Sequence, residues 1–172
     1  EQGISYKPLD LSHAGCVAAL ESRIMGSDAW NELLVADEIP RRDRTWWAAY
    51  ASEGKPGEVG ALVGYAGGWV VDGDVQILKV GTDPAWRRRG IARELLAHVA
   101  ADARNLGAQT VSLEVRAGNE GAQALYKALG LAPVGTRPRY YSDREDALIM
   151  QGDLAALVGA AEPAEESSRL VA

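Results

Sequence analysis

Phenylalanine is absent from this chain of 172 residues, and cysteine occurs once, at Cys16. Trp, Tyr and aliphatic side chains must therefore fill the core, and no disulfide can form within the chain. A lone cysteine suits a reducing compartment, so we expect a cytoplasmic protein. No apolar run approaches the ~18 residues of a membrane-spanning helix, and the opening residues lack a secretory signal pattern. We therefore expect no membrane partner.

Positive charge is in deficit, because 24 Asp and Glu residues against 18 Lys and Arg residues give a net charge of −6. This balance argues against non-specific DNA binding, although an acidic surface suits a basic acceptor. His13 and His98 are isolated, and no cluster has the spacing of metal ligands, so we expect no metal. Length and composition indicate one domain over residues 1–158, followed by a mobile Ala- and Glu-rich tail over 159–172. We expect a monomer.

Alternating apolar residues and turn signals predict the order strand, two helices, three strands, helix, strand, helix and two strands. The expected strands cover residues 4–9, 45–51, 59–71, 75–82, 110–116, 131–140 and 147–154. The expected helices begin near Ser12, near Trp30, near Gly90 and after Asn119. This order predicts an α/β (α+β) fold in which a mixed central sheet of about seven strands carries helices on both faces.

Local signals fix several boundaries. Asp72-Gly73-Asp74 is typical of a tight hairpin, and Gly107 suits the end of a helix. A turn is expected over 52–57. Ser27 or Asp28 is expected to cap the second helix. The first helix is expected to present one apolar face, made of His13, Cys16, Leu20 and Ile24.

A basic turn, Arg87-Arg88-Arg89-Gly90-Ile91-Ala92, stands where a strand gives way to a helix. The free backbone N–H groups and the dipole of a helix start attract phosphate, and small residues such as Gly90 and Ala92 let it approach. Arg93 adds further positive charge. A dinucleotide fingerprint does not fit, because that motif needs three glycines. The turn therefore predicts either a pyrophosphate site or a solvated basic helix start.

A strand over 110–116 would place its apolar residues on one face and Glu114 on the other. Glu114 is then either an exposed carboxylate paired with Arg116 or a catalytic base. Asn119 stands where a helix begins and suits a cap. Tyr126 on that helix is either a core residue with a hydrogen-bonded hydroxyl or a proton donor. The residues by themselves leave these alternatives open.

Together these motifs resemble the GCN-five-related N-acetyltransferases (GNAT). The basic turn matches that family's (Gln/Arg)-x-x-Gly-x-(Gly/Ala) signature. The run Leu113-Glu114-Val115-Arg116-Ala117-Gly118-Asn119, with Ala124-Leu125-Tyr126, is similar to the bacterial ribosomal-protein-alanine N-acetyltransferases of the family, the RimI group. Arg137-Pro138-Arg139-Tyr140-Tyr141 extends the resemblance, which is strong over about residues 75–150. The resemblance implies the GNAT fold.

The resemblance also implies acetyl transfer from acetyl-CoA to the N-terminal α-amine of a protein, by direct attack in a ternary complex. The implied acceptor is the N-terminal Ala of small-subunit ribosomal protein eighteen. Glu114 would be the general base and Tyr126 the general acid. The residues implied for acetyl-CoA are Val80, Gly81, Thr82, Arg88, Arg89, Gly90, Ile91, Ala92, Arg93 and Asn119. Those implied for the acceptor are Tyr140, Tyr141 and Trp30, although the tyrosines could instead form a cross-strand aromatic pair.

The chain departs from the RimI pattern at two places. Leu131 follows Gly130 where these enzymes commonly have Phe, and this difference changes packing alone. The basic loop over 41–44 is unlike theirs and leaves the acceptor open. The alternatives are a GNAT enzyme for a lysine side chain, a polyamine or an antibiotic, a non-catalytic acyl-CoA sensor, and a subunit of a tRNA-modifying or ribosomal assembly.

Overall fold

A seven-stranded mixed sheet forms the centre of the structure, with the strand order β1-β2-β3-β4-β5-β7-β6. The computed structural model describes residues 3–52 and 60–159. The strands are β1 (Ile4–Pro8), β2 (Arg44–Ala51), β3 (Ala61–Val71), β4 (Asp74–Thr82), β5 (Thr110–Arg116), β6 (Ala132–Arg137) and β7 (Ala147–Asp153). The α-helices are α1 (Ala14–Met25), α2 (Glu32–Glu38), α3 (Ile91–Asn105), α4 (Glu120–Ala128) and α5 (Leu154–Gly159). Short 3-10 turns are η1 (Leu11–His13), η2 (Gly26–Asp28) and η3 (Pro84–Trp86). This order confirms the predicted fold class.

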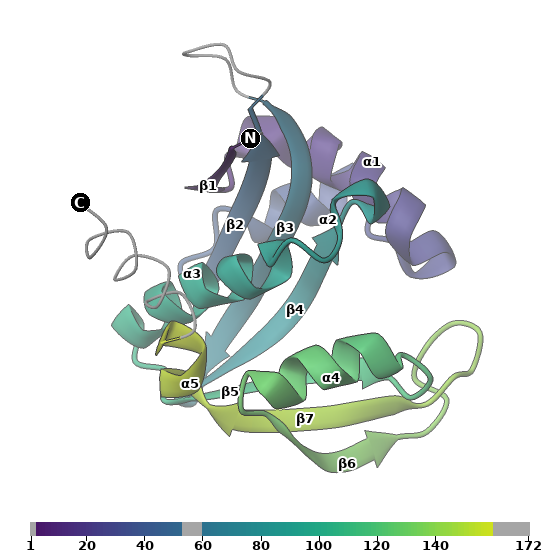
Figure 1. The fold of residues 1–172 in the computed structure, drawn as a ribbon. Helices are drawn as coiled ribbons and strands as arrows, with labels where there is room; N and C mark the ends of the chain where they lie inside the picture. Colours follow the sequence, from purple (N-terminus) through teal and green to yellow (C-terminus); the bar gives the residue numbers. More distant parts are fainter. Residues whose placement is uncertain (1–2, 53–59, 160–172) are drawn as a thin grey trace.

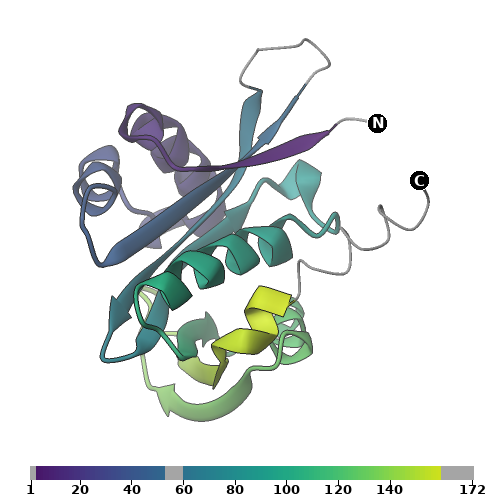
Figure 2. The ribbon, with the colours of Figure 1, turned by 90° about the vertical axis from the view of Figure 1, so that its left-hand side faces the viewer.

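Helices lie on both faces of the sheet (Figures 1 and 2). Helices α1 and α2 cover one face, and α3 and α5 cover the other. Successive side chains of β2 serve the two faces in turn: Ala48 and Tyr50 join the core under α1, whereas Ala49 and Ala51 join the core under α3. Helix α4 belongs to the α3 side, because its Tyr126 lies in that second core.

The expected turn signals are confirmed. Asp72 and Gly73 connect β3 to β4 with φ values of 51° and 77°. This pair of positive φ angles matches the right-handed twist of a hairpin. Gly107 follows α3 with a φ of 95°, a left-handed conformation that suits a helix end.

The expected face of α1 is correct at Leu20, which is buried, and at Ile24, which packs against the same core, but wrong at Cys16, which is exposed. Ala14, Val17 and Glu21 are buried instead. Glu21 resembles a surface residue in the sequence, but its side chain is 1% exposed. Its carboxylate accepts hydrogen bonds from the Tyr65 hydroxyl at 2.8 Å and the Trp30 amide at 2.7 Å, and lies 3.4 Å from Lys79 Nζ. A buried carboxylate needs such partners.

The expected cap of α2 is also wrong. Asn31 caps the helix, because its side chain accepts a hydrogen bond from the Leu34 amide at 3.0 Å. Ser27 and Asp28 lie earlier, in η2, and face the loop between β6 and β7.

Two further features differ from those expected. β6 ends at Arg137, so Tyr140 and Tyr141 lie in the loop between β6 and β7 and form no cross-strand pair. Helix α5 is an addition to the expected elements, and its Leu157 is buried in the core under α3. Of the expected tail over 159–172, Gly159 ends α5 and the rest lies outside the described residues, as does most of the turn over 52–57.

The one feature of the sheet that creates space is the divergence of β4 from β5. These parallel neighbours pair only from Asp74 to Gln76 on β4 and from Thr110 to Ser112 on β5. Beyond Gln76, β4 continues to Thr82 along β3, while β5 continues to Arg116 along β7. The facing edges of the two strands are therefore left without a strand partner and enclose a gap (Figure 1).

Replacing Gly67 by alanine is expected to destabilise the fold. A Cβ at this position would overlap the ring of Trp46, which is buried and packs on Trp30 with 5.9 Å between ring centroids. Over-packing of this kind costs about 1–3 kcal/mol. Gly135→Ala is the matched control, because its Cβ would make ordinary contact with Ile149. Urea unfolding should show the loss for Gly67→Ala alone, and equal stabilities would contradict the packing assigned to Trp46.

Candidate active site

A cavity of about 800 Å³ lies at the gap between β4 and β5. β4 supplies one wall, the basic turn and the start of α3 supply a second, and α4 supplies a third. The end of α1 contributes Ile24 and Met25, and the end of β5 contributes Arg116. Nine of the ten residues expected to contact acetyl-CoA line this cavity: Val80, Gly81, Thr82, Arg88, Gly90, Ile91, Ala92, Arg93 and Asn119.

The basic turn presents backbone donors to the cavity. Gly90 precedes α3 with a φ of 76° and provides no side-chain cap for the helix. The amides of the first helical turn consequently have no intrahelical acceptor and face the end where the helix dipole is positive. Ile91, Ala92 and Arg93, which carry these amides, all line the cavity. This arrangement is suited to a phosphate group.

The arginines in and after the basic turn occupy two different environments. Arg87, Arg88 and Arg93 line the cavity and make its wall positive. Arg89 is not part of that wall: its guanidinium lies 4.4 Å from the centroid of the Trp86 ring, in a cation–π contact. Arg87 and Trp86 are lining residues outside the predicted cofactor set, and the signal that could have found them is their adjacency to the turn.

Asn119 and Tyr126 reach the cavity from α4. The Asn119 side chain accepts a hydrogen bond from the Ala122 amide at 3.1 Å, so it caps the helix as expected while it also lines the cavity. Tyr126 is 6% exposed. Burial, and secondarily the nearby Tyr141, raises the pKa of Tyr126 to about 12. The phenol therefore keeps its proton at neutral pH.

Glu114 lies on the other face of β5 from the buried Val111, Leu113 and Val115 and is not among the lining residues of the cavity. Its carboxylate accepts a hydrogen bond from Arg137 Nε at 3.1 Å, and so its ion-pair partner is Arg137 and not the expected Arg116. Burial first, and the charge of Glu114 second, raises the pKa of Tyr140. The carboxylate and the phenol of Tyr126 thus approach the strand gap from opposite faces of the sheet.

The residues expected for the acceptor are brought together only in part. Tyr140 and Tyr141 lie beside the Glu114 side of the gap and pack edge to face, with 5.1 Å between ring centroids. Burial, as the largest cause, raises the pKa of Tyr141 to about 12. Trp30 lies apart from them, in the core under α1, where its ring packs on Trp46 and receives Lys79 Nζ at 5.1 Å from its centroid.

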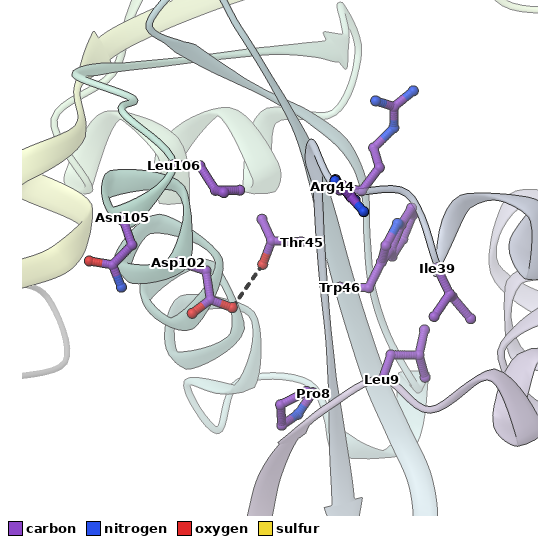
Figure 3. Close-up of a pocket in the computed structure, with 10 residues that line it drawn as sticks. Pro8, Leu9, Ile39, Arg44, Thr45, Trp46, Asp102, Asn105 and Leu106 are labelled. Atoms are coloured by element: carbon purple, nitrogen blue, oxygen red, sulfur yellow. Dashed lines mark hydrogen bonds between the residues drawn. The ribbon is translucent and has the colours of Figure 1, made fainter.

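A second, smaller cavity of about 400 Å³ lies at the edge of the sheet, near the start of β2 (Figure 3). Its polar groups are largely paired: Asp102 accepts from Thr45 at 3.0 Å and Arg44 contacts Glu38 at 2.6 Å. Trp46 Nε1 is buried without a hydrogen-bond partner, but it is closed to solvent, so a ligand in this open cavity could not reach it. This cavity does not offer a reactive constellation.

Across residues 3–52 and 60–159, no three His, Cys, Asp or Glu side chains are grouped as metal ligands. No helix in the same ranges combines the length and apolar character needed to cross a bilayer.

The geometry can be set beside known proteins. Residues 17–131 match the sequence profile of the acetyltransferase (GNAT) family. The chain belongs to the acetyltransferase (GNAT) family. The matched region contains every residue that lines the cavity, from Ile24 at the end of α1 to Tyr126 in α4.

Two relatives are named as N-acetyltransferases. The N-alpha-acetyltransferase RimI of Mycobacterium tuberculosis is 34% identical over 142 residues, 79% of this chain and 84% of the relative. The putative [ribosomal protein bS18]-alanine N-acetyltransferase of Bacillus subtilis is 41% identical over 92 residues, 53% of this chain. That match spans 61% of the length of the Bacillus subtilis relative.

Two solved structures share the fold. The ribosomal-protein-S18-alanine N-acetyltransferase from Escherichia coli has a TM-score of 0.75 at 27% identity, over 88% of this chain and 94% of that chain. The NAA60 protein of Arabidopsis thaliana, solved in complex with acetyl-CoA, has a TM-score of 0.76 at 20% identity, over 89% and 99% of the two chains. These likenesses confirm the predicted GNAT fold.

Replacing Asn119 by alanine is expected to destabilise the protein by about 1 kcal/mol, because the Ala122 amide would lose its capping acceptor. Asn119→Ser is the matched control, since a serine hydroxyl can accept the same hydrogen bond. The free energy of unfolding in urea measures both variants. A loss of equal size in the serine variant would show that the cap is not what Asn119 contributes to stability.

Proposed function

We propose that this protein transfers the acetyl group of acetyl-CoA to the N-terminal α-amine of a protein. The observation that carries the proposal is the pair of Tyr126 and Glu114 on opposite faces of the strand gap, with a phosphate-binding turn at one end of the cavity. The names of the relatives from Mycobacterium tuberculosis and Bacillus subtilis support an N-terminal acceptor. The favoured acceptor is the N-terminal Ala of small-subunit ribosomal protein eighteen.

In this proposal the basic turn holds the pyrophosphate of acetyl-CoA. The first-turn amides of α3 would donate hydrogen bonds, and Arg87, Arg88 and Arg93 would supply positive charge. β4 would accompany the pantetheine arm, because its edge facing β5 has no strand partner beyond Gln76. A backbone N–H near Gly81 would stabilise the oxyanion that develops on the thioester carbonyl.

The proposed chemistry moves one proton at each end of the reaction. Glu114 takes a proton from the acceptor ammonium, directly or through a water, because an α-amine has a pKa of about 8 and is largely protonated at neutral pH. The free amine then forms a bond to the carbonyl carbon, and the bond from carbon to sulfur breaks. Tyr126 gives its proton to the departing sulfur, and its raised pKa keeps that proton available. The nitrogen loses its second proton as the amide forms, and this proton restores the neutral phenol of Tyr126, directly or through water.

The domain extent, the cellular location and the charge of the acceptor follow from the sheet topology and the composition. We propose that residues 1–158 act as one domain, since a single sheet connects β1 to β6. The lone cysteine supports a cytoplasmic location. The net charge of −6 favours a protein acceptor with basic residues over a nucleic acid.

The test is acetylation of two synthetic peptides, read by mass spectrometry after incubation with acetyl-CoA. One peptide has a free N-terminal Ala followed by basic residues, and the other has a blocked N-terminus and internal lysines. The proposal expects acetyl transfer to the first peptide alone. Transfer to the second alone would overturn the acceptor. No transfer to either would favour a small amine as acceptor or an acyl-CoA sensor.

Tyr126→Phe is expected to lower kcat by about 10²–10⁴, the usual effect of a proton-transfer group. Acetyl-CoA affinity should stay near that of the wild type, because the ring and its packing are retained. Steady-state kinetics and calorimetric titration with acetyl-CoA separate the two effects. An unchanged kcat would remove Tyr126 from the role of acid.

Glu114→Gln is expected to lose most activity at low pH. Below about pH 8 the acceptor amine is mostly protonated and needs a base, whereas above that pH the free amine attacks unaided. The measurement is kcat/KM for the Ala peptide across pH 6 to 9.5. A loss that is the same at every pH would show that Glu114 orients the acceptor and does not take its proton.

A further inference from the structure

Arg116 lies on the same face of β5 as Glu114, lines the cavity and stands at the centre of an ion cluster. Its guanidinium contacts Asp28 at 2.6 Å, Asp143 at 2.9 Å and Glu145 at 3.0 Å. The same group lies 4.1 Å from the centroid of the Tyr141 ring. A planar fork of donors can serve several carboxylates and an aromatic face at once, which an ammonium cannot do.

The cluster joins two segments that are distant in sequence. Asp28 ends η2, the connection between α1 and α2, whereas Asp143 and Glu145 belong to the loop between β6 and β7. Two further hydrogen bonds tie the same segments: the Ser142 amide donates to Asp28 at 3.1 Å, and the hydroxyls of Ser27 and Ser142 lie 2.9 Å apart. Asp28 therefore holds both Arg116 and the β6–β7 loop.

This connection spans the place where β4 and β5 have separated. η2 packs on α1, which lies over β3 and β4, while the β6–β7 loop belongs to the β5 side of the sheet. Since the strands no longer pair there, contacts between η2 and the loop fix the width of the opening on this face. Tyr141 is held at that opening by Arg116, next to Tyr140 and the Glu114 side.

We propose that Asp28 and Arg116 form a bridge that positions Tyr140 and Tyr141 around the acceptor amine. The inference rests on the function proposed above and adds a positioning role for Asp28, which does not line the acetyl-CoA cavity. Loss of the bridge lets η2 and the β6–β7 loop separate, so the acceptor binds more weakly. Replacing Asp28 leaves the acetyl-CoA wall in place, because β4, the basic turn, α4 and Arg116 itself are all retained.

The test compares Asp28→Asn with Asp143→Asn in steady-state kinetics on the free N-terminal Ala peptide. Both variants remove one negative charge next to Arg116, but Asp143 lies on the same loop as Tyr141 and does not reach η2. Asp28→Asn is expected to raise KM for the peptide about tenfold, with kcat and acetyl-CoA affinity within about threefold of the wild type. Asp143→Asn is expected to change KM by less than about threefold.

A double variant, Asp28→Asn with Arg116→Gln, tests the pair directly. If the two side chains act through one bridge, the double variant should raise KM no more than Arg116→Gln does alone. Urea unfolding of each variant identifies any that does not fold, and hydrogen exchange of the Ser142 amide then reports on the bridge in the folded ones.

Three outcomes would overturn the bridge: an unchanged KM in Asp28→Asn, equal rises in KM for Asp28→Asn and Asp143→Asn, or a fall in kcat at constant KM. Inactivity of the wild type on the Ala peptide would instead refute the proposed function on which the bridge rests. Activity of the wild type with no difference between the variants would refute the bridge alone.

Discussion

The separation of β4 from β5 is the constraint on which the rest of the site depends. Three residue pairs hold the two strands together, and past Gln76 each strand follows a different neighbour. A parallel pair that stayed in register would fill this space with backbone hydrogen bonds. Because the pair opens, the start of α3, the cap of α4 and the end of α1 come to surround one cavity. Tyr126 lines this cavity, whereas Glu114 lies on the other face of β5 and is not among the lining residues.

The opening also gathers positive charge. Arg87, Arg88, Arg93 and Arg116 all line the cavity, and Asp28, Asp143 and Glu145 form ion pairs with Arg116. A net charge of −6 conceals this local group of cations. Under the proposed function, the basic walls favour the encounter with an anionic co-substrate.

Much of the site was predictable because its residues come from two short, continuous segments. The basic turn and the run from Glu114 to Tyr126 each carry their own strand, turn and helix signals, so nine of the ten expected cofactor residues line one cavity. The predictions failed for side chains whose contacts come from residues distant in sequence. Glu21 resembles a surface residue in the sequence, but it is buried against Tyr65 and Lys79. Asp28 resembles a helix cap, but its carboxylate binds Arg116 and the Ser142 amide. Helix α5 has few residues, and only its packing under α3 makes it stable.

The sequence by itself determined the order of the elements from β1 to β7, the turns at Asp72-Gly73 and Gly107, the cap at Asn119 and the basic turn before α3. Each of these local features depends on residues that are close together in the chain. Only the tertiary structure decided which face of β5 meets which neighbour. It placed Glu114 beside Arg137, Arg116 against Asp28, and Tyr126 in the core across the sheet. The alternation of side chains along a strand identifies its two faces. It does not show which residues pack on each face, because those residues can be distant in sequence, as Asp28 is from Arg116 at a separation of 88.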